Sequence, residues 1–244
     1  MLLQFSVTNH RSIKNTAVIS MKAAADKSMK ECLITPDGKK KIVPVMAIYG
    51  ANAAGKSNVI HALLLMREMV CGNYAKPLKG EELPYEPFAF VDEQIEPTAL
   101  EVIYYYEGIK YAYGFSFNNE RIISEYLYHW PNGREALIFN REKDQYEFRE
   151  SVQEQLTLAG RTSENRLYLT SSNEWNCVQT ENAYLWFQKN LRGLVATGIS
   201  NEITIDAIRK GGEKKQCIVK EMMLADLGIS DIELSGTKEK PIIS

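Results

Sequence analysis

The chain contains 244 residues, 45% of them hydrophobic and 25% charged, and its formal net charge at pH 7 is −2. This composition is ordinary for a soluble globular protein with a buried core, and it gives no overall attraction to nucleic acid or an anionic membrane. No stretch approaches the roughly 20 apolar residues of a membrane span, and the amino terminus lacks the basic region of a secretory signal. The sequence therefore predicts a cytoplasmic protein with no membrane partner.

Cysteine and histidine residues are few and scattered, and no two cysteines form a CxxC pair. Without a secretory signal this favours reduced thiols, and it gives no support to a zinc site or a histidine-based catalytic triad. The residues concerned are Cys32, Cys71, Cys177, Cys217, His10, His61 and His129.

The first part of the chain has the pattern of strands. Residues 2–13 and 16–24 alternate polar and apolar side chains, which predicts two β-strands joined by a short turn. The sequence Pro-Asp-Gly at 36–38 predicts another turn. Residues 41–50, "KIVPVMAIYG", are apolar and rich in β-branched side chains, which predicts a third strand.

A glycine-rich loop, "GANAAGKS", ends this run. Gly50, Gly55, Lys56 and Ser57 fit the pattern G-x-x-x-x-G-K-[ST] without a mismatch. The glycines allow successive N–H groups to turn toward one anion, and a helix that begins near Lys56 directs its free N–H groups at the same place. In this pattern the lysine reaches the β- and γ-phosphates and the serine hydroxyl binds Mg²⁺. The alternative is an ordinary turn between a strand and a helix.

An apolar stripe predicts the helix after the loop, because Val59, Leu63, Met66 and Val70 recur at spacings of three to four. Residues 71–97 contain four prolines, which predicts an irregular connector.

The next block is rich in β-strand patterns. Residues 98–130 predict three strands joined by tight turns at 107–108 and 118–119, and residues 135–141 and 145–150 predict a further hairpin. In the second strand, four aromatic side chains share one face, which favours packing on a core over stacking on nucleobases. These are Tyr111, Tyr113, Phe115 and Phe117.

Beyond residue 150 the pattern becomes helical. Residues 150–160 and 180–191 predict helices, and residues 220–244 predict a helix, a turn, a strand and a polar tail. Two lysine clusters predict solvated loops, with contact to nucleic acid as the alternative. They comprise residues 39–41 and Lys210, Lys214 and Lys215.

Hydrolysis of a nucleotide needs an acidic residue near Mg²⁺, usually at the end of an apolar strand. The segment "PFAFVDE" comes closest to this pattern, and it ends at Asp92 and Glu93. Because it is short and lies in the proline-rich connector, a loop or strand edge is the favoured interpretation.

Together these residues resemble the start of the ABC-type ATPase heads of SMC, RecF and OLD proteins. The closer similarity is to bacterial AAA-family ATP-binding proteins of that superfamily, many of which belong to phage-defence operons. It rests on "TNHRSI", "IYGANAAGKSN", "PFAF", "IKYAYGFSFNNERIISEYLYHWPNGREALIFNR" and "NRLYLT". The resemblance implies an α/β (α+β mix) P-loop NTPase fold, the N-terminal lobe of an ABC-type head with a large antiparallel β portion and flanking helices.

The resemblance also implies a set of site residues that bind ATP, with Ser57 as a ligand of Mg²⁺. The phosphate loop comprises Gly50, Ala51, Asn52, Ala53, Ala54, Gly55, Lys56, Ser57 and Asn58. Arg11 matches a basic residue that approaches the nucleotide phosphates in such heads, although a surface arginine is the alternative. His10 stands where the family usually has an aromatic residue, and the glutamine of the Q-loop is not placed.

Heads of this family also contain a signature motif and a Walker B strand ending in Asp-Glu, and neither occurs in the sequence. We therefore expect the N-terminal lobe of a longer protein, with a natural short protein as the alternative. The expected organisation is a nucleotide-binding core at 1–70, a β-rich subdomain at 71–150, and a helical segment at 151–244 that leads to a C-terminal lobe.

In this superfamily two heads enclose two nucleotides, so the resemblance implies a second ATPase head as partner. The expected function is ATP binding and, in the complete protein, hydrolysis that drives head dimerisation in anti-phage defence or DNA surveillance. An effector nuclease, a toxin or DNA is the expected further partner. Two alternatives remain: a non-hydrolysing ATP-sensing scaffold for such a partner, and an OLD-type nuclease whose catalytic domain lies beyond residue 244.

Overall fold

The computed structural model describes residues 1–25, 30–36, 38, 41–52, 54–90, 96–193, 202–224, 231–232, 234–236 and 241–243. The chain divides into two compact units, Met1–Arg192 and Gly193–Ser244. No helix among the described residues is long and apolar enough to cross a membrane.

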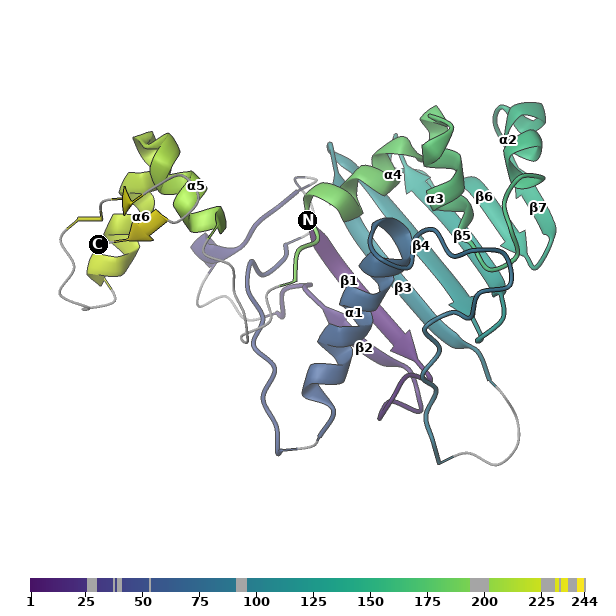
Figure 1. Cartoon of the computed structure of the whole chain (residues 1–244), viewed down its shortest axis with the longest axis horizontal. Helices are drawn as coiled ribbons and strands as arrows, with labels where there is room; N and C mark the ends of the chain where they lie inside the picture. Colours follow the sequence, from purple (N-terminus) through teal and green to yellow (C-terminus); the bar gives the residue numbers. More distant parts are fainter. Residues whose placement is uncertain are drawn as a thin grey trace. The chain divides into compact units, whose positions relative to one another are not determined.

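An antiparallel sheet forms the centre of the first unit (Figure 1). Its strand order is β2-β1-β3-β4-β5-β6-β7, and each neighbouring pair runs antiparallel. The strands are β1 Leu2–Thr8, β2 Ala17–Ser20, β3 Thr98–Tyr106, β4 Ile109–Phe117, β5 Ile122–Trp130, β6 Ala136–Glu142 and β7 Gln145–Phe148. The strands predicted in the first 24 residues, in 98–130 and in the hairpin after 135 are confirmed, as is the large antiparallel β portion.

Helices cover one face of this sheet (Figure 1). They are α1 Lys56–Cys71, α3 Tyr168–Glu174 and α4 Val178–Lys189, while α2 Val152–Ala159 contacts β7 and a short 3-10 helix spans Lys30–Cys32. The helix after the glycine-rich loop and the helices predicted at 150–160 and 180–191 are confirmed, whereas α3 was not predicted. The described part of the 71–97 connector is irregular, as expected.

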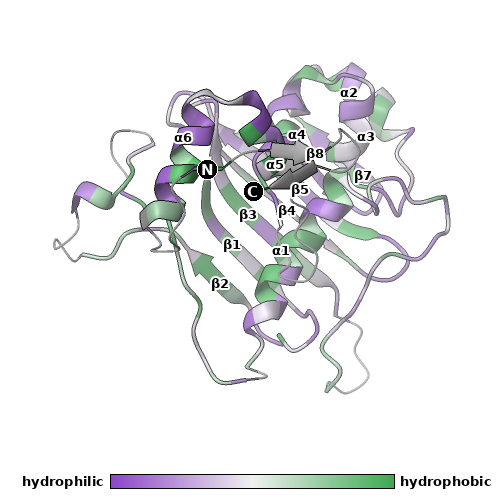
Figure 2. Cartoon of the chain, turned by 60° about the vertical axis from the view of Figure 1, so that its left-hand side comes forward, coloured by the Kyte–Doolittle hydropathy of each residue, from purple (hydrophilic) through white to green (hydrophobic). Residues whose placement is uncertain are grey.

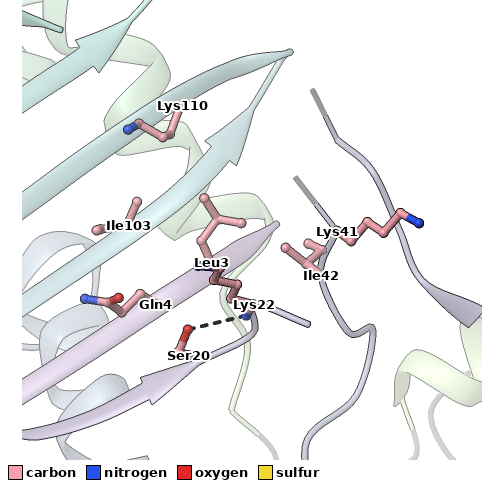
Figure 3. Close-up of a pocket in the computed structure, with 8 residues that line it drawn as sticks. All are labelled: Leu3, Gln4, Ser20, Lys22, Lys41, Ile42, Ile103 and Lys110. Atoms are coloured by element: carbon pink, nitrogen blue, oxygen red, sulfur yellow. Dashed lines mark hydrogen bonds between the residues drawn. The ribbon is translucent and has the colours of Figure 1, made fainter. Parts of the chain in front are cut away.

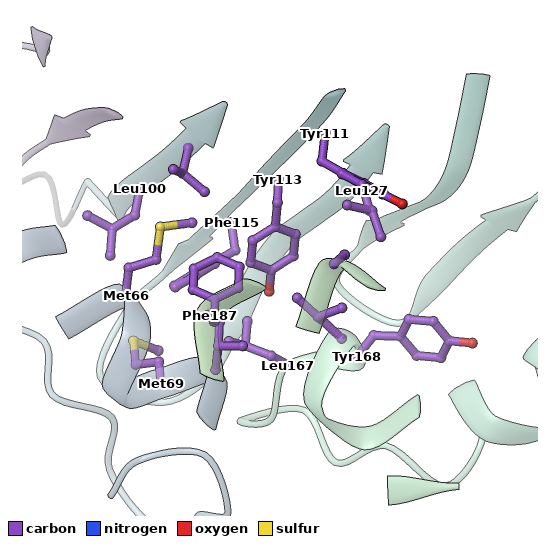
Figure 4. Close-up of a cluster of buried hydrophobic side chains, with 14 of the residues drawn as sticks. Met66, Met69, Leu100, Tyr111, Tyr113, Phe115, Leu127, Leu167, Tyr168 and Phe187 are labelled. Carbon is purple, nitrogen blue, oxygen red and sulfur yellow. The ribbon is translucent and has the colours of Figure 1, made fainter. Parts of the chain in front are cut away.

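The core lies between the sheet and these helices. Met66 and Met69 of α1, Leu100 of β3 and Phe187 of α4 meet the aromatic residues of β4 there (Figure 4). Tyr113 and Phe187 form an edge-to-face pair with ring centroids 5.6 Å apart. The four aromatic residues of the predicted stripe are buried, which confirms the prediction of a core face. Burial of each such side chain contributes about 1.5–3 kcal/mol relative to exposure.

The amphipathic pattern of α1 explains its position. Leu63, Met66 and Val70 of the predicted stripe are buried, and Val59 is partly buried against the core. Hydrophobic and hydrophilic stretches alternate along this helix in Figure 2. The helix therefore lies on β1 and β3 and carries the glycine-rich loop at its N-terminal end.

The strand predicted at residues 41–50 is absent. Ile42 forms isolated bridges with Lys22 and Ile34, but the following residues belong to no strand. Ile42 is buried, but residues 44–50 are exposed, with Val45 and Tyr49 at 77% and 89%, so this later part of the segment does not belong to the core. The prediction failed because hydrophobic periodicity reports what a segment can bury, whereas a strand also needs a paired neighbour. Residues 41–43 have backbone partners in residues 21–23 and 34, but the N–H groups of residues 45–49 have none among the described residues.

A buried polar cluster joins α3 to the sheet. The carboxylate of Glu125, on β5, is 0% exposed and accepts hydrogen bonds from the N–H groups of Tyr168 and Leu169 at 2.6 and 2.9 Å. It also accepts from the Tyr113 hydroxyl at 2.9 Å and lies 3.5 Å from Nη1 of Arg141. Glu125 thus satisfies free N–H groups at the start of α3 from outside the helix.

Three stretches that carry the family resemblance meet in this cluster. Glu125 belongs to "RIISEYLY", Arg141 to "ALIFNR" and Tyr168 to "NRLYLT". Their contacts are internal to the fold, so these stretches hold the sheet and α3 together.

On the opposite face of the sheet, a glycine makes room for an aromatic ring. Glu101, Gly114 and Tyr126 are aligned across β3, β4 and β5. The Tyr126 hydroxyl donates to the Glu101 carboxylate, and a Cβ at Gly114 would lie 2.6 Å from ring atom Cζ of Tyr126. The lack of a side chain at Gly114 therefore permits this cross-strand hydrogen bond.

The second unit contains two helices and a small antiparallel pair among its described residues. These are α5 Glu202–Lys210, α6 Gly212–Leu224, β8 Leu234–Gly236 and β9 Pro241–Ile243. The helix and strand predicted near the end of the chain are confirmed. The polar tail is wrong in part, because Pro241–Ile243 pairs with β8; the apolar residues at 242 and 243 suit that position.

The loop predicted for the second lysine cluster is wrong. Lys210 ends α5, and Lys214 and Lys215 lie in the first half of α6. The Lys210 ammonium pairs with Asp206 one turn earlier at 2.6 Å, an arrangement that supports a helix. In the first cluster, Lys39 and Lys40 lie outside the described residues.

Candidate nucleotide-binding site

Gly55 sets the geometry of the loop. It precedes the first residue of α1 with a φ of 85°, in the left-handed region that favours glycine. Gly55, the N-cap residue, has no side chain to cap the first N–H groups of α1, and no other described side chain bonds to them, so the positive end of the helix dipole faces the loop. A Cβ at Gly55 would lie 2.8 Å from the Oγ of Ser12, so this position also requires a small residue.

Lys56 closes back over the start of the loop. Its Nζ donates to the carbonyl oxygens of Gly50 and Ala51, at 2.8 and 2.6 Å. The positive charge of the side chain is therefore held at the loop and pairs with no carboxylate among the described residues. Ser57, the predicted Mg²⁺ ligand, is exposed in the first turn of α1.

The other predicted loop residues lie on the surface or at the start of α1. Asn52 and Ala54 are exposed, and Asn58 lies in the first turn of α1. Ala53 lies outside the described residues, as do Asp92 and Glu93, the predicted acidic pair of the connector. No group of three metal-binding side chains occurs in the part of the chain that the structure describes.

A tight turn after β1 lies against the loop. His10 and Ile13 exchange two backbone hydrogen bonds of 2.8 Å, and the Oγ of Ser12 accepts a hydrogen bond from Nδ2 of Asn58 at 2.7 Å. Residues 9–14, defined here as the β1 turn, therefore contact the first turn of α1. This brings Arg11 to the same end of the helix as Lys56 and Ser57.

His10 is buried beneath this turn. It is 2% exposed, and its two ring nitrogens have no hydrogen-bond partner among the described residues. Burial lowers the pKa of the imidazole, so the neutral ring is favoured. A buried ring without a polar partner is a position that an apolar aromatic residue would also suit.

Glu86 is the site residue that the sequence did not reveal. Its carboxylate accepts a hydrogen bond from Nε of Arg11, and this bond from Arg11 lowers the pKa of Glu86. The two residues are 75 positions apart, so no local pattern could have linked them. Only the antiparallel path of the chain places the connector beside the β1 turn.

A separate hollow of about 380 Å³ lies on the other face of the sheet (Figure 3). Three lysines are among its lining residues, but they do not converge on one point. Lys110 lies 3.1 Å from the centre of the Trp130 ring, and the ammonium of Lys41 points away from the other labelled side chains (Figure 3). Because its cations are divided in this way, the hollow lacks the geometry of an anion site.

The residues at the N-terminal end of α1 are suited to bind the phosphate chain of a nucleotide. Gly55 is in the backbone conformation that the cradle needs, the helix N-terminus is uncapped, and one lysine charge is held in the loop. The exposed Ser57 hydroxyl suits Mg²⁺, which prefers oxygen ligands and keeps several waters. A glycine-rich loop with this residue pattern that leads into a helix is typical of the P-loop class of nucleotide-binding proteins, although no strand directly precedes the loop among the described residues.

Comparison with known families agrees with this class. The family described as "AAA domain, putative AbiEii toxin, Type IV TA system" matches residues 45–198, more than half of the chain. The chain therefore belongs to this family of P-loop ATPase domains. None of the curated proteins matches the sequence.

Proposed function

We propose that the chain binds ATP with Mg²⁺ through Gly50–Asn58 and forms the nucleotide-binding lobe of an ABC-type ATPase. The observation that carries the proposal is the arrangement at the end of α1, where the uncapped N-terminus, Gly55 and Lys56 form one cationic cradle. Lys56 would hold the β- and γ-phosphates, and Ser57 would hold the metal. Mg²⁺ would supply charge neutralisation at the phosphates when bound.

The exposed segment before the loop supports completion of the site by another element. Residues 44–49 are apolar and exposed, belong to no helix or strand, and lead directly into the cradle. The N–H groups of residues 45–49 donate to no described backbone carbonyl, and unpaired backbone groups can pair with a strand of another element. We propose that strands of a C-terminal lobe lie beside it, and that a second head completes the nucleotide site.

The proposed biological role is anti-phage defence, with a toxin or nuclease as the partner. This part rests on the resemblance of the sequence and on the toxin-associated family to which the chain belongs. The proposed location is the cytoplasm.

ATP binding without hydrolysis is a second candidate. It uses the same cradle, because the residues of the loop account for phosphate and metal binding and include no acidic residue that could orient an attacking water. In that case the chain is an ATP-sensing scaffold for its partner, and the bound nucleotide acts through conformation alone.

Titration of Mg·ATP into the wild-type chain and Lys56→Ala tests nucleotide binding. Loss of a charge-assisted contact of this kind predicts about tenfold weaker affinity or more. Lys189→Ala, an exposed lysine at the end of α4, is the matched control and should bind as the wild type does. Equal affinity of the wild type and Lys56→Ala would refute the proposal. Phosphate release by the wild type then separates the ATPase from the non-hydrolysing scaffold.

A further inference from the structure

Two residues of the β1 turn have an uncommon backbone conformation, which is a reason to look for a function there. Asn9 and Arg11 have φ values of 51° and 50°, in the left-handed region. Asparagine tolerates this region, whereas it is uncommon for arginine and carries a conformational cost. The turn keeps Arg11 in this conformation through the two His10–Ile13 hydrogen bonds and the contact of Ser12 with Asn58. These contacts fix the backbone of Arg11 in a turn that touches the first turn of α1.

Glu86 holds Arg11 at two independent points. The Arg11 N–H donates to the carbonyl oxygen of Glu86 at 2.7 Å, and the Arg11 Nε donates to the Glu86 carboxylate. The N–H of Phe88 donates to the side-chain oxygen of Asn9 at 2.9 Å and gives the same two segments a further link. The connector is thus attached to the turn by bonds that do not involve the Glu86 carboxylate, whose hydrogen bond goes to the guanidinium.

The Arg11–Glu86 ion pair is exposed to solvent, so another anion could replace the carboxylate at little cost. The side chains of Arg11 and Glu86 are 38% and 55% exposed. Ion pairs of this exposure contribute about 0–1 kcal/mol, because water and salt screen them. A triphosphate carries more charge than one carboxylate and would lie at the uncapped end of α1, where the helix dipole adds to the attraction.

We propose that Glu86 is a positioning residue that holds Arg11 beside the loop until nucleotide arrives, and that Arg11 then exchanges this carboxylate for a phosphate oxygen. The inference rests on the proposed function, since it assigns the exchange to the same ATP site. Glu86 therefore competes with the nucleotide for Arg11 and lowers the apparent affinity. Removal of its charge should strengthen binding, which is the opposite of the effect of losing a structural contact.

Titration of Mg·ATP into four proteins tests this exchange: the wild type, Glu86→Gln, Arg11→Ala and the double variant. Because a surface pair contributes at most about 1 kcal/mol, Glu86→Gln should bind ATP up to about fivefold more tightly. Arg11→Ala should bind more weakly, and the double variant should match Arg11→Ala, since Glu86 acts through Arg11. Glu82→Gln, an exposed residue of the same connector, is the control and should leave affinity unchanged.

Two readouts separate positioning from a structural role. The NMR signal of the Arg11 side-chain Nε–H should shift when ATP is added to the wild type, and removal of Glu86 should shift it without nucleotide. Thermal unfolding of nucleotide-free Glu86→Gln should match the wild type, because the backbone links remain. The affinity gain of Glu86→Gln should also shrink as salt concentration rises.

The outcomes distinguish the two levels of the argument. If Lys56→Ala abolishes binding but Glu86→Gln binds as the wild type or more weakly, the exchange is refuted and the ATP site stands. The exchange is also refuted if the NMR signal of the Arg11 Nε–H does not shift when ATP is added. If no protein binds ATP at millimolar concentration, the proposed function fails, and the exchange fails with it.

Discussion

Substitution of Glu125 is the most demanding test of the fold that supports the site. Glu125→Ala removes a carboxylate that is 0% exposed and accepts hydrogen bonds from Tyr113, Tyr168 and Leu169. It also leaves Arg141 buried at 1% exposure without its nearby counter-charge. Breaking a buried pair by removing one partner costs about 3–5 kcal/mol of unfolding free energy.

The lower part of this range is expected, because Arg141 keeps other partners. Its guanidinium donates to the carbonyl oxygens of Lys143, Glu164 and Arg166, at distances of 2.6–3.2 Å. A loss of about 3 kcal/mol corresponds to a fall in Tm of roughly 6–12 °C for a domain of this size. Glu125→Gln keeps an oxygen acceptor and should lose less than Glu125→Ala.

Chemical denaturation followed by circular dichroism measures this loss. The matched control is Glu147→Ala, which breaks the exposed pair with Arg149 at the edge of the sheet. That change should cost at most about 0.5 kcal/mol. If Glu125→Ala costs less than about 1 kcal/mol, the carboxylate is not what holds α3 to the sheet, and the reasoning above is wrong.

The remaining predictions concern three positions. His10 has a pKa below its unfolded value, so its contribution to stability is complete above pH 6.5 and is lost as pH falls through the folded-state pKa. His10→Phe should remove this pH dependence and add about 1 kcal/mol, measured by denaturation at pH 5 and pH 8; an unchanged pH profile would contradict it. Gly55→Ala should weaken ATP binding in a titration, because its Cβ would meet the Oγ of Ser12 at 2.8 Å, and Ser12→Ala should restore part of the affinity. Gly114→Ala should lower the free energy of unfolding by about 1–3 kcal/mol, because the added Cβ displaces the Tyr126 ring. If Gly114→Ala is equally destabilising in a protein that already carries Tyr126→Ala, the clash with this ring is not the cause.

Local patterns predicted most of the first unit because most of its sheet is built from hairpins. Each of β3 to β6 pairs with the next strand in the chain, so alternation and turn residues contain the needed information. The helix α1 could be predicted for the same reason, since its apolar stripe from Val59 to Val70 spans about three turns. In contrast, α3 has only seven residues and takes its N-terminal hydrogen bonds from Glu125, 43 positions earlier than Tyr168. Its start is therefore fixed by a distant residue.

The candidate site divides in the same way. The glycine-rich loop is a contiguous motif, so Gly55, Lys56 and Ser57 could be proposed from the sequence, and their ligand contacts stay a prediction. Arg11 entered through resemblance alone, and its partner Glu86 had no local signal. The failed strand at 41–50 shows the limit of such patterns, because its pairing depends on a neighbour that the pattern does not describe.

The unpaired segment at residues 45–49 could report directly on whether a partner strand has bound to it. In the part of the chain that the structure describes, the N–H groups of residues 45–49 donate to no backbone carbonyl. Amide hydrogens of this kind exchange quickly with deuterium, and incorporation into a β-ladder slows the exchange strongly. Mass spectrometry of deuterium uptake over this single peptide would therefore follow the arrival of a neighbouring strand in a mixture. It would do so without a label and before the neighbour is identified.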